Sequence, residues 1–203
     1  VMQSIFGGDQ ITSGEIMIHG KRIVNRSPRE AIRNGFALLP ENRKQQGFIS
    51  VYTNCQNIVL PSLKRFLKGI FINKEKTREV TRQVGRQIQL KPEDPEFMTA
   101  HLSGGNQQKV IVAKWLVSNA DIIIFDEPTK GIDVGAKAEI YAIMEELVEN
   151  GKSLIMVSSE LPELSGISDR IIVMCEGRIA GRFEREEFSE DAILTCALGE
   201  DKE

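Results

Sequence analysis

The fold class is decided by the stretch Ile122-Ile123-Ile124-Phe125-Asp126-Glu127-Pro128-Thr129, a β-rich apolar run that ends in two consecutive acids. In a parallel sheet, ligands bind outside the carboxyl ends of the strands, so we expect Asp126 and Glu127 to face a binding crevice. An aspartate in that place can hold Mg²⁺ through water, and the adjacent glutamate can orient or deprotonate an attacking water. The structural alternative is the polar end of an ordinary strand.

Helices and strands alternate around this run. The sequence predicts helices near 104–118 and 136–150 and strands at 121–125 and 153–157. Such alternation favours an α/β protein in which crossover helices connect the strands of a parallel sheet. The helix at 136–150 carries the apolar stripe of a helix packed on a sheet, formed by Ile140, Ile143, Met144, Leu147 and Val148.

The rest of the chain gives weaker signals. From about 51 to 101 the pattern turns helical and charged; a solvated helical face explains its basic residues, with a lipid or nucleic-acid patch as the alternative. The other predicted elements are, in chain order, the end of a helix at 2–6, a strand pair within 15–23, a short helix at 28–33, a buried strand at 35–40, a hairpin at 170–175 and 178–183, and a last helix capped by Ser189.

Length, charge and cysteine usage narrow the class of protein. The 203 residues, with 41% hydrophobic composition, can form one substantial core and a small appended subdomain. A formal net charge of -3 argues against nucleic acid as the main partner. Three widely spaced cysteines are typical of reduced thiols in a cytosolic protein. No apolar run reaches the roughly 18 to 20 residues of a membrane helix.

A second chemical signal is the stretch from Leu102 to Val110, which reads LSGGNQQKV. Ser103 is placed to cap a helix, and Gly104 and Gly105 let the backbone approach a ligand closely. The N–H groups at such a helix end suit a phosphate. The helix dipole contributes only about 0.3–1 kcal/mol, so this element can complete an anion site but cannot form one alone. A capped structural helix is the alternative.

Several ordered segments resemble those of ABC ATPases. The segment 103–108 resembles the ABC signature motif, Asp126-Glu127 resembles the Walker B element with its catalytic glutamate, and 131–133 resembles the D-loop that follows. Other segments narrow the resemblance to the second cassette of the double-cassette ATPases that drive ribose, galactose and xylose importers: PENRK at 40–44, TKGIDVGAK at 129–137 and SSELPE at 158–163. The resemblance covers nearly the whole chain.

This resemblance implies a fold and a set of site residues. The implied fold is a P-loop NTPase-like α/β core with an inserted helical subdomain, in one cassette at 1–203. Its parts are an antiparallel β part at 11–24, the helical subdomain at about 51–101, and the catalytic core with a C-terminal hairpin and helix at 102–203. The implied Mg²⁺ residue is Asp126, and the implied catalytic residues are Glu127 and Ser159. The residues expected to contact ATP are Ser103, Gly104, Gly105, Asn106, Gln107, Glu41 and Asp133.

The chain departs from the family pattern in three respects. It has no G-x-x-x-x-G-K-[ST] phosphate loop, which we expect to lie just before Val1, and the triplet at 151–153 is no substitute because it follows a helix and enters a strand. Glu41 stands where the family has the Q-loop glutamine, and Ser159 stands where it has the switch histidine. A serine cannot carry positive charge toward a phosphate, so the chain's own site is expected to be the degenerate half.

The resemblance also implies a mechanism and partners. Two cassettes sandwich ATP head to tail, and this one is expected to lend Ser103, Gly104 and Gly105 to ATP on a second cassette, on the same full-length chain or in a homodimer. The segment 41–100 would contact sugar permease subunits at the cytoplasmic face of the membrane, and a periplasmic or extracellular sugar-binding protein would act indirectly. The isolated fragment is expected to be inactive. The alternatives are a soluble ABC-type ATPase outside transport and a non-catalytic regulatory cassette.

Overall fold

The computed structural model describes residues 1–199. The chain forms two compact units, Val1–Val157 and Ser158–Glu203. The regions expected as the antiparallel β part and the helical subdomain lie in the first unit, and the region expected as the catalytic core with its C-terminal hairpin and helix contributes to both units.

The sheet of the first unit contains three parallel strands in the order β3-β6-β7, with bounds Phe36–Leu39, Ile122–Asp126 and Ser153–Val157. The central strand β6 pairs Phe125 with Leu39 on one side and Asp126 with Val157 on the other. Its residues 123–125 are buried, as expected for the middle of a covered parallel sheet. The α/β class is therefore confirmed, and the three strands end at one edge.

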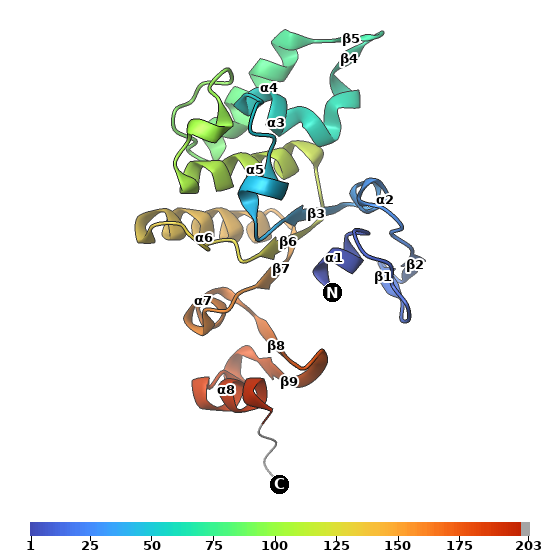
Figure 1. Ribbon diagram of the computed structural model, residues 1–203, viewed down its shortest axis with the longest axis vertical. Helices are drawn as coiled ribbons and strands as arrows, with labels where there is room; N and C mark the ends of the chain where they lie inside the picture. The colour runs from blue at the N-terminus through green and yellow to red at the C-terminus, as the bar shows by residue number, and fades with distance from the viewer. Residues whose placement is uncertain (200–203) are drawn as a thin grey trace. The chain divides into compact units, whose positions relative to one another are not determined.

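Two long helices, α5 (Gly104–Ser118) and α6 (Val134–Glu149), lie between successive strands of this sheet along the chain (Figure 1). Ser103 caps α5 as predicted. The Ser103 and Asp133 side chains accept hydrogen bonds from backbone N–H groups of the first turn of α5 and α6. The indole Nε1 of Trp115 donates to the Leu38 carbonyl at 2.9 Å, which fixes α5 against β3. Among residues 1–199, no helix has both the length and the apolar character needed to cross a membrane.

A largely helical region lies between β3 and α5. It contains a π-helical turn at Arg43–Gly47, α3 (Asn54–Val59), a 3-10 segment at Leu60–Phe66, β4 (Leu67–Lys68), β5 (Phe71–Ile72), α4 (Lys74–Gln87) and a 3-10 turn at Thr99–His101. The helical prediction for this stretch is wrong at 67–72, where β4 and β5 form an antiparallel hairpin. Gly69 turns the chain with a φ of +65°, and the β-branched and aromatic residues that follow favour a strand.

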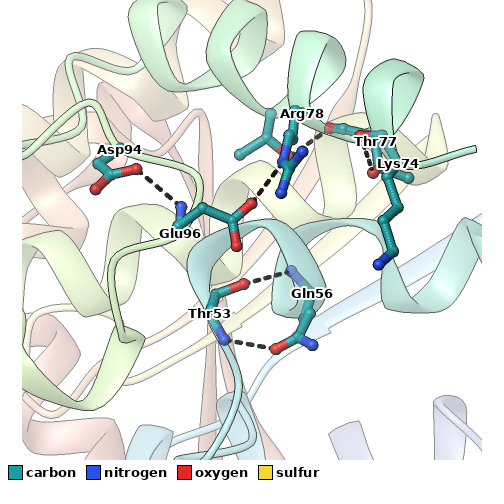
Figure 2. A network of polar contacts seen from close by, with 8 residues as sticks. Thr53, Gln56, Lys74, Thr77, Arg78, Asp94 and Glu96 are labelled. Atoms are coloured by element: carbon teal, nitrogen blue, oxygen red, sulfur yellow. Dashed lines mark hydrogen bonds and ion pairs between the residues drawn. The ribbon is translucent and has the colours of Figure 1, made fainter.

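Buried amide and hydroxyl groups hold this helical region together. The Asn57 amide donates to the Thr99 hydroxyl at 3.0 Å, and that hydroxyl donates to the Asn54 side chain at 2.9 Å. All three residues are buried, so these hydrogen bonds are made away from water, where an unpaired polar group is costly. Figure 2 shows the surface counterpart, with Thr53 and Gln56 in a reciprocal cap of α3 and Arg78 of α4 paired to Glu96.

The start of the chain contains short elements at the predicted places. They are α1 (Met2–Ile5), the antiparallel pair β1 (Ile16–Ile18) and β2 (Lys21–Ile23), and α2 (Pro28–Arg33). Phe6 packs edge-on against Trp115, with ring centroids 5.9 Å apart, so this segment contacts α5. Ser27 caps α2 and Pro28 begins it, which is a favourable helix start.

The second unit contains α7 (Leu161–Ile167), the antiparallel hairpin β8 (Arg170–Cys175) and β9 (Arg178–Glu184), a 3-10 turn at Arg185–Glu187, and α8 (Glu190–Leu198). Ile171, Val173 and Ile193 form its small apolar core. The predicted hairpin is present within one residue of its expected bounds, and Ser189 caps α8 as predicted.

Candidate functional site

The two acids after the central strand lie at the carboxyl edge of the sheet. Asp126 is the last residue of β6, and Glu127 follows with a left-handed backbone φ of 50°. The Glu127 N–H donates to the Val157 carbonyl at 2.9 Å, so the neighbouring strand β7 holds this conformation. Non-glycine residues in this conformation are uncommon and concentrate at functional sites.

Glu41 joins these two acids. Burial raises the pKa of Asp126, and the negative charges of Glu41 and Glu127 raise it further. Asp126 therefore lies within electrostatic range of two other carboxyl groups, one that follows β3 and one that follows β6. Carboxylate oxygens suit Mg²⁺, and a cation would relieve their mutual repulsion.

The remaining Mg²⁺ ligands would have to come from elsewhere. In the part of the chain that the structure describes, no group of three or more His, Cys, Asp or Glu side chains could hold a metal ion by itself. Mg²⁺ usually keeps several waters and binds one or two carboxylates together with substrate phosphates. The Asp126 carboxylate therefore fits Mg²⁺ as one ligand, and nucleotide oxygens and water would have to supply the others.

Glu41 and Arg43, after β3, contact Lys130 and Gly131, after β6. We call this set of contacts the latch. Glu41 pairs with the Lys130 ammonium at 2.6 Å, and this hydrogen bond raises the pKa of Lys130. The Arg43 guanidinium donates to the Lys130 carbonyl at 2.7 Å and to the Gly131 carbonyl at 3.0 Å. Burial lowers the pKa of Arg43. The sequence analysis assigned no role to Arg43 or Lys130. The opposite charges of Glu41 and Lys130 are the one feature of the sequence that agrees with this ion pair.

Ser103 and Asn106 shape the amino end of α5. Ser103 is exposed, and its hydroxyl accepts from the Asn106 backbone N–H at 3.4 Å and from the Asn106 amide at 3.0 Å. The Asn106 side-chain oxygen accepts from the backbone N–H of Lys91 at 2.8 Å. The Asn106 side chain is therefore engaged within the fold, while Ser103 lies at the surface.

Gln107 lies on the inner side of the same turn. It is only 4% exposed, and its amide donates to the carbonyls of Ala100 and Leu102, both at 3.2 Å. These contacts fix the backbone that precedes Ser103. Gln107 thus stabilises the exposed end of α5 from its buried side.

The two glycines of this turn make close internal contacts. A Cβ added to Gly104 would lie 2.8 Å from an Arg43 guanidinium nitrogen, and one added to Gly105 would lie 2.6 Å from the Cβ of Ala136. Ala136 belongs to the first turn of α6, and its N–H donates to Asp133 at 3.0 Å. The signature segment, the latch and the D-loop segment are therefore neighbours, and close packing explains the glycines independently of any ligand.

Ser159 belongs to the second unit. It lies between Ser158, whose hydroxyl donates to Glu163 at 3.0 Å, and Glu160, which precedes α7. The Glu160 N–H donates to the Ser158 hydroxyl at 3.0 Å, which shapes the turn that carries Ser159.

Two lysines on α5 tie this helix to its surroundings, and the sequence reasoning missed both. Lys109 is 3% exposed; its ammonium pairs with Glu139 of α6 at 2.7 Å and donates to the Gln89 carbonyl at 3.0 Å. Lys114 donates to the Gly47 carbonyl at 2.6 Å, and burial lowers its pKa to about 8. These contacts connect α5 to α6, to the end of α4 and to the π-helical turn.

A parallel sheet whose central strand ends in two acids, next to a serine-capped glycine turn, defines the class as a nucleotide-binding cassette of the P-loop NTPase type. A profile of the family described as ABC transporter matches residues 1–130, and the chain belongs to this family.

Relatives of known name carry the comparison further. The ribose import ATP-binding protein RbsA of Bacillus subtilis (strain 168) is 44% identical over 199 residues, which are 98% of this chain and 40% of the relative. A putative ribose/galactose/methyl galactoside import ATP-binding protein of Geobacillus kaustophilus (strain HTA426) is 44% identical over 200 residues, with the same two coverages of 98% and 40%. The chain thus spans about two fifths of the length of these relatives.

Solved structures share the fold. The ATP-binding cassette MJ0796, in a dimeric post-hydrolysis state bound to ADP and Pi, matches with a TM-score of 0.76 and 22% identity, over 92% of this chain and 80% of that one. The ADP conformation of the cassette MJ1267 matches with a TM-score of 0.79 and 20% identity, over 98% and 82%. These structures confirm the cassette fold.

Proposed function

We propose that this chain is one ATP-binding cassette of a sugar-import ATPase, in which ATP hydrolysis drives transport. Its relatives at 44% identity are named as ribose or ribose/galactose/methyl galactoside import ATP-binding proteins and align over 98% of the chain. The permease subunits that such an ATPase serves, a sugar-binding protein outside the cell, and attachment to the cytoplasmic face of the membrane belong to the same proposal.

The observation that carries the proposed mechanism is the placement of the amino end of α5. Ser103 is exposed at this end, and Gly104 beside it lies against Arg43 and Gly131 rather than inside the core. A helix end with an exposed hydroxyl, which can donate a hydrogen bond, and with backbone N–H groups suits a phosphate group. Ser103, Gly104 and Gly105 would therefore contact ATP seated on a second cassette, while Asn106 and Gln107 hold the turn in shape.

The chain's own site is proposed to be the weaker half. Asp126 would bind the Mg²⁺ of a bound nucleotide, where the ion neutralises phosphate charge, and Glu41 and Asp133 would border the nucleotide. Glu127 would orient water at the strand end. Ser159 can donate a hydrogen bond to a phosphate but cannot bring positive charge to it. Glu41 is also paired with Lys130, which engages one of its oxygens.

Charge at the end of α5 tests this proposal in the full-length protein reconstituted with its permease. Ser103→Glu places an anion where the triphosphate would lie, so we expect ATP hydrolysis to fall at least about tenfold. Ser189→Glu is the matched control, because Ser189 is also an exposed helix-capping serine but lies at α8. Hydrolysis that is equal in the two variants would refute the role of Ser103.

A second variant separates the two ATP sites. Glu127→Gln removes the carboxylate that could act on water in the chain's own site while keeping the size of the side chain. We expect transport to stay within about threefold of the parent, because this site lacks the switch histidine. Abolished transport would instead assign hydrolysis to this half. Co-purification with ribosomes or DNA in place of a permease would favour an ABC-type ATPase outside transport.

A further inference from the structure

The hairpin formed by β4 and β5 carries exposed apolar residues at its tip. Ile70 is 87% exposed and Phe71 is 73% exposed, and Leu67 and Ile72 on the two strands are also exposed. Figure 1 shows the hairpin extending away from α3 and α4. A contiguous group of exposed apolar side chains on a polar protein surface marks a contact site.

The root of the hairpin is anchored, whereas its tip makes no close packing contact. Phe66 at the root is 3% exposed, and its carbonyl accepts from the Asn73 N–H at 2.8 Å. A Cβ added to Gly69 at the tip would meet nothing within 4 Å. The apolar tip is therefore held out from a fixed base, and the fold itself does not use it.

Basic residues flank this tip in the sequence. From Lys64 to Arg78 the chain has six basic residues and one acidic residue, in a protein whose overall charge is -3. Arg65 and Arg78 are engaged, with the Val117 carbonyl at 2.6 Å and with Glu96 at 2.7 Å. The other four are exposed lysines with no side-chain hydrogen bond or ion pair among residues 1–199: Lys64, Lys68, Lys74 and Lys76. Figure 2 shows the Lys74 ammonium pointing away from the polar network of its neighbours.

The size of the tip distinguishes between possible partners. A stable protein interface buries about 800 Å² on each side, which four apolar side chains do not supply. Strands of two residues, at about 3.3 Å per residue, reach roughly 7–10 Å with the turn included. An interfacial segment buries its apolar side about 5–10 Å into the boundary between head groups and acyl chains, so the reach of the hairpin matches this depth.

We propose that the β4–β5 hairpin binds the surface of an anionic lipid membrane, with Ile70 and Phe71 in the interface and the four lysines against phosphate head groups. Lysines near an anionic surface are attracted to it, and the apolar tip adds a contribution that salt does not screen. The interaction needs neither nucleotide nor a partner cassette. The hairpin would hold the helical region at the membrane independently of any contact with a permease.

Vesicle flotation of the purified 203-residue chain tests this inference without nucleotide. We expect binding to vesicles of equal parts phosphatidylglycerol and phosphatidylcholine, and little binding to phosphatidylcholine alone. The double variant Ile70→Ser/Phe71→Ser should bind at least about tenfold more weakly. Val51→Ser removes an aliphatic side chain that is 76% exposed outside the hairpin and should bind like the parent.

The charges are tested in the same assay. Lys68→Gln/Lys74→Gln should weaken binding to the anionic vesicles severalfold. Lys21→Gln/Arg29→Gln is the control, because it changes the net charge by the same amount on exposed residues outside the hairpin, and it should not weaken binding. Equal loss in both pairs would mean attraction by net charge and would overturn the proposal.

A fluorescent reporter shows whether the tip enters the lipid. Phe71→Trp adds a tryptophan at the tip, and Trp115, the only native tryptophan, is buried. Its emission should shift to the blue on binding anionic vesicles and should be quenched by brominated acyl chains. The proposal is overturned if this emission does not change, or if the double serine variant binds vesicles as well as the parent does. It is also overturned if the parent does not bind vesicles and the hairpin variants lose association with the permease, because the partner of the hairpin is then a protein.

Discussion

Replacing Gly105 with alanine tests whether close packing of α5 on α6 fixes the signature turn. The new Cβ would lie 2.6 Å from the Cβ of Ala136, far inside ordinary contact distance. The neighbour is a short side chain on a helix, so it cannot swing aside, and the two helices must separate. Gly85→Ala in α4 is the matched control, because the added Cβ would meet Leu90 side-chain atoms at 3.8 Å, an ordinary contact.

The magnitude follows from two opposing terms. Alanine in place of glycine inside a helix stabilises it by up to about 1 kcal/mol in both variants. Overpacking at a tight contact costs about 1–3 kcal/mol, and only Gly105→Ala incurs this cost. The free energies of unfolding of the two variants should therefore differ by about 1–3 kcal/mol, with Gly85→Ala the more stable.

Urea unfolding followed by the fluorescence of Trp115 measures this difference, because Trp115 lies in α5 and reports on the first unit. With a slope of about 2 kcal/mol per molar urea, the midpoints should differ by roughly 1 M. Equal midpoints for the two variants would refute the packing explanation. The glycine at 105 would then be attributed to its approach to a ligand alone.

Three further predictions concern the ionisable and buried polar groups. Because the pKa of Asp126 is raised in the folded protein, the folded state holds this proton more tightly than the unfolded chain does. The stability that this provides is present below the ordinary aspartate pKa and is lost as the pH rises through the raised value. Asp126→Asn should therefore flatten the fall in the free energy of unfolding that urea titrations measure from about pH 4 to about pH 7. The lowered pKa of Lys114, about 8 against 10.5, means that the unfolded chain holds this proton over that interval, so stability should rise with pH there, and Lys114→Met should abolish the rise. Thr99→Val removes the hydrogen bond that the buried Asn54 side-chain oxygen accepts, while the Asn57 amide keeps its bonds to backbone carbonyls. It should lower the free energy of unfolding by about 1–3 kcal/mol, whereas Thr12→Val at an exposed site should change it by less than about 0.5 kcal/mol.

The strands and long helices were predictable because their signals are local. The apolar run of β6 and the stripe of α6 carry their own periodicity, and Ser103, Asp133 and Ser189 mark helix starts by their side-chain chemistry. The two acids of the site follow from the end of a strand in the same way. Their expected position at the sheet edge needed only the parallel topology.

The contacts that the sequence reasoning missed are between residues far apart in the chain. Arg43 reaches Gly131, and Lys114 reaches Gly47, across separations that no periodicity records. The polar run from Gln107 to Lys109 gives no sign that these side chains are buried. The hairpin at 67–72 was overlooked because its strands have only two residues each, too short for alternation to show.

The position of Ser103 is set by several contacts that act on one helix. Trp115 fixes α5 to β3, Lys109 fixes it to α6, and Gly105 allows its first turn to touch Ala136. A helix held at several points moves as a unit, since shifting one contact strains the others. A helix end that binds an anion needs such rigid support, because the helix dipole contributes little to binding. Its N–H groups stabilise the anion only when the fold already orients them toward it. The buried polar residues that follow the glycines therefore keep the exposed turn in position, which explains why a motif proposed to contact ATP at its first residues continues so far into the core.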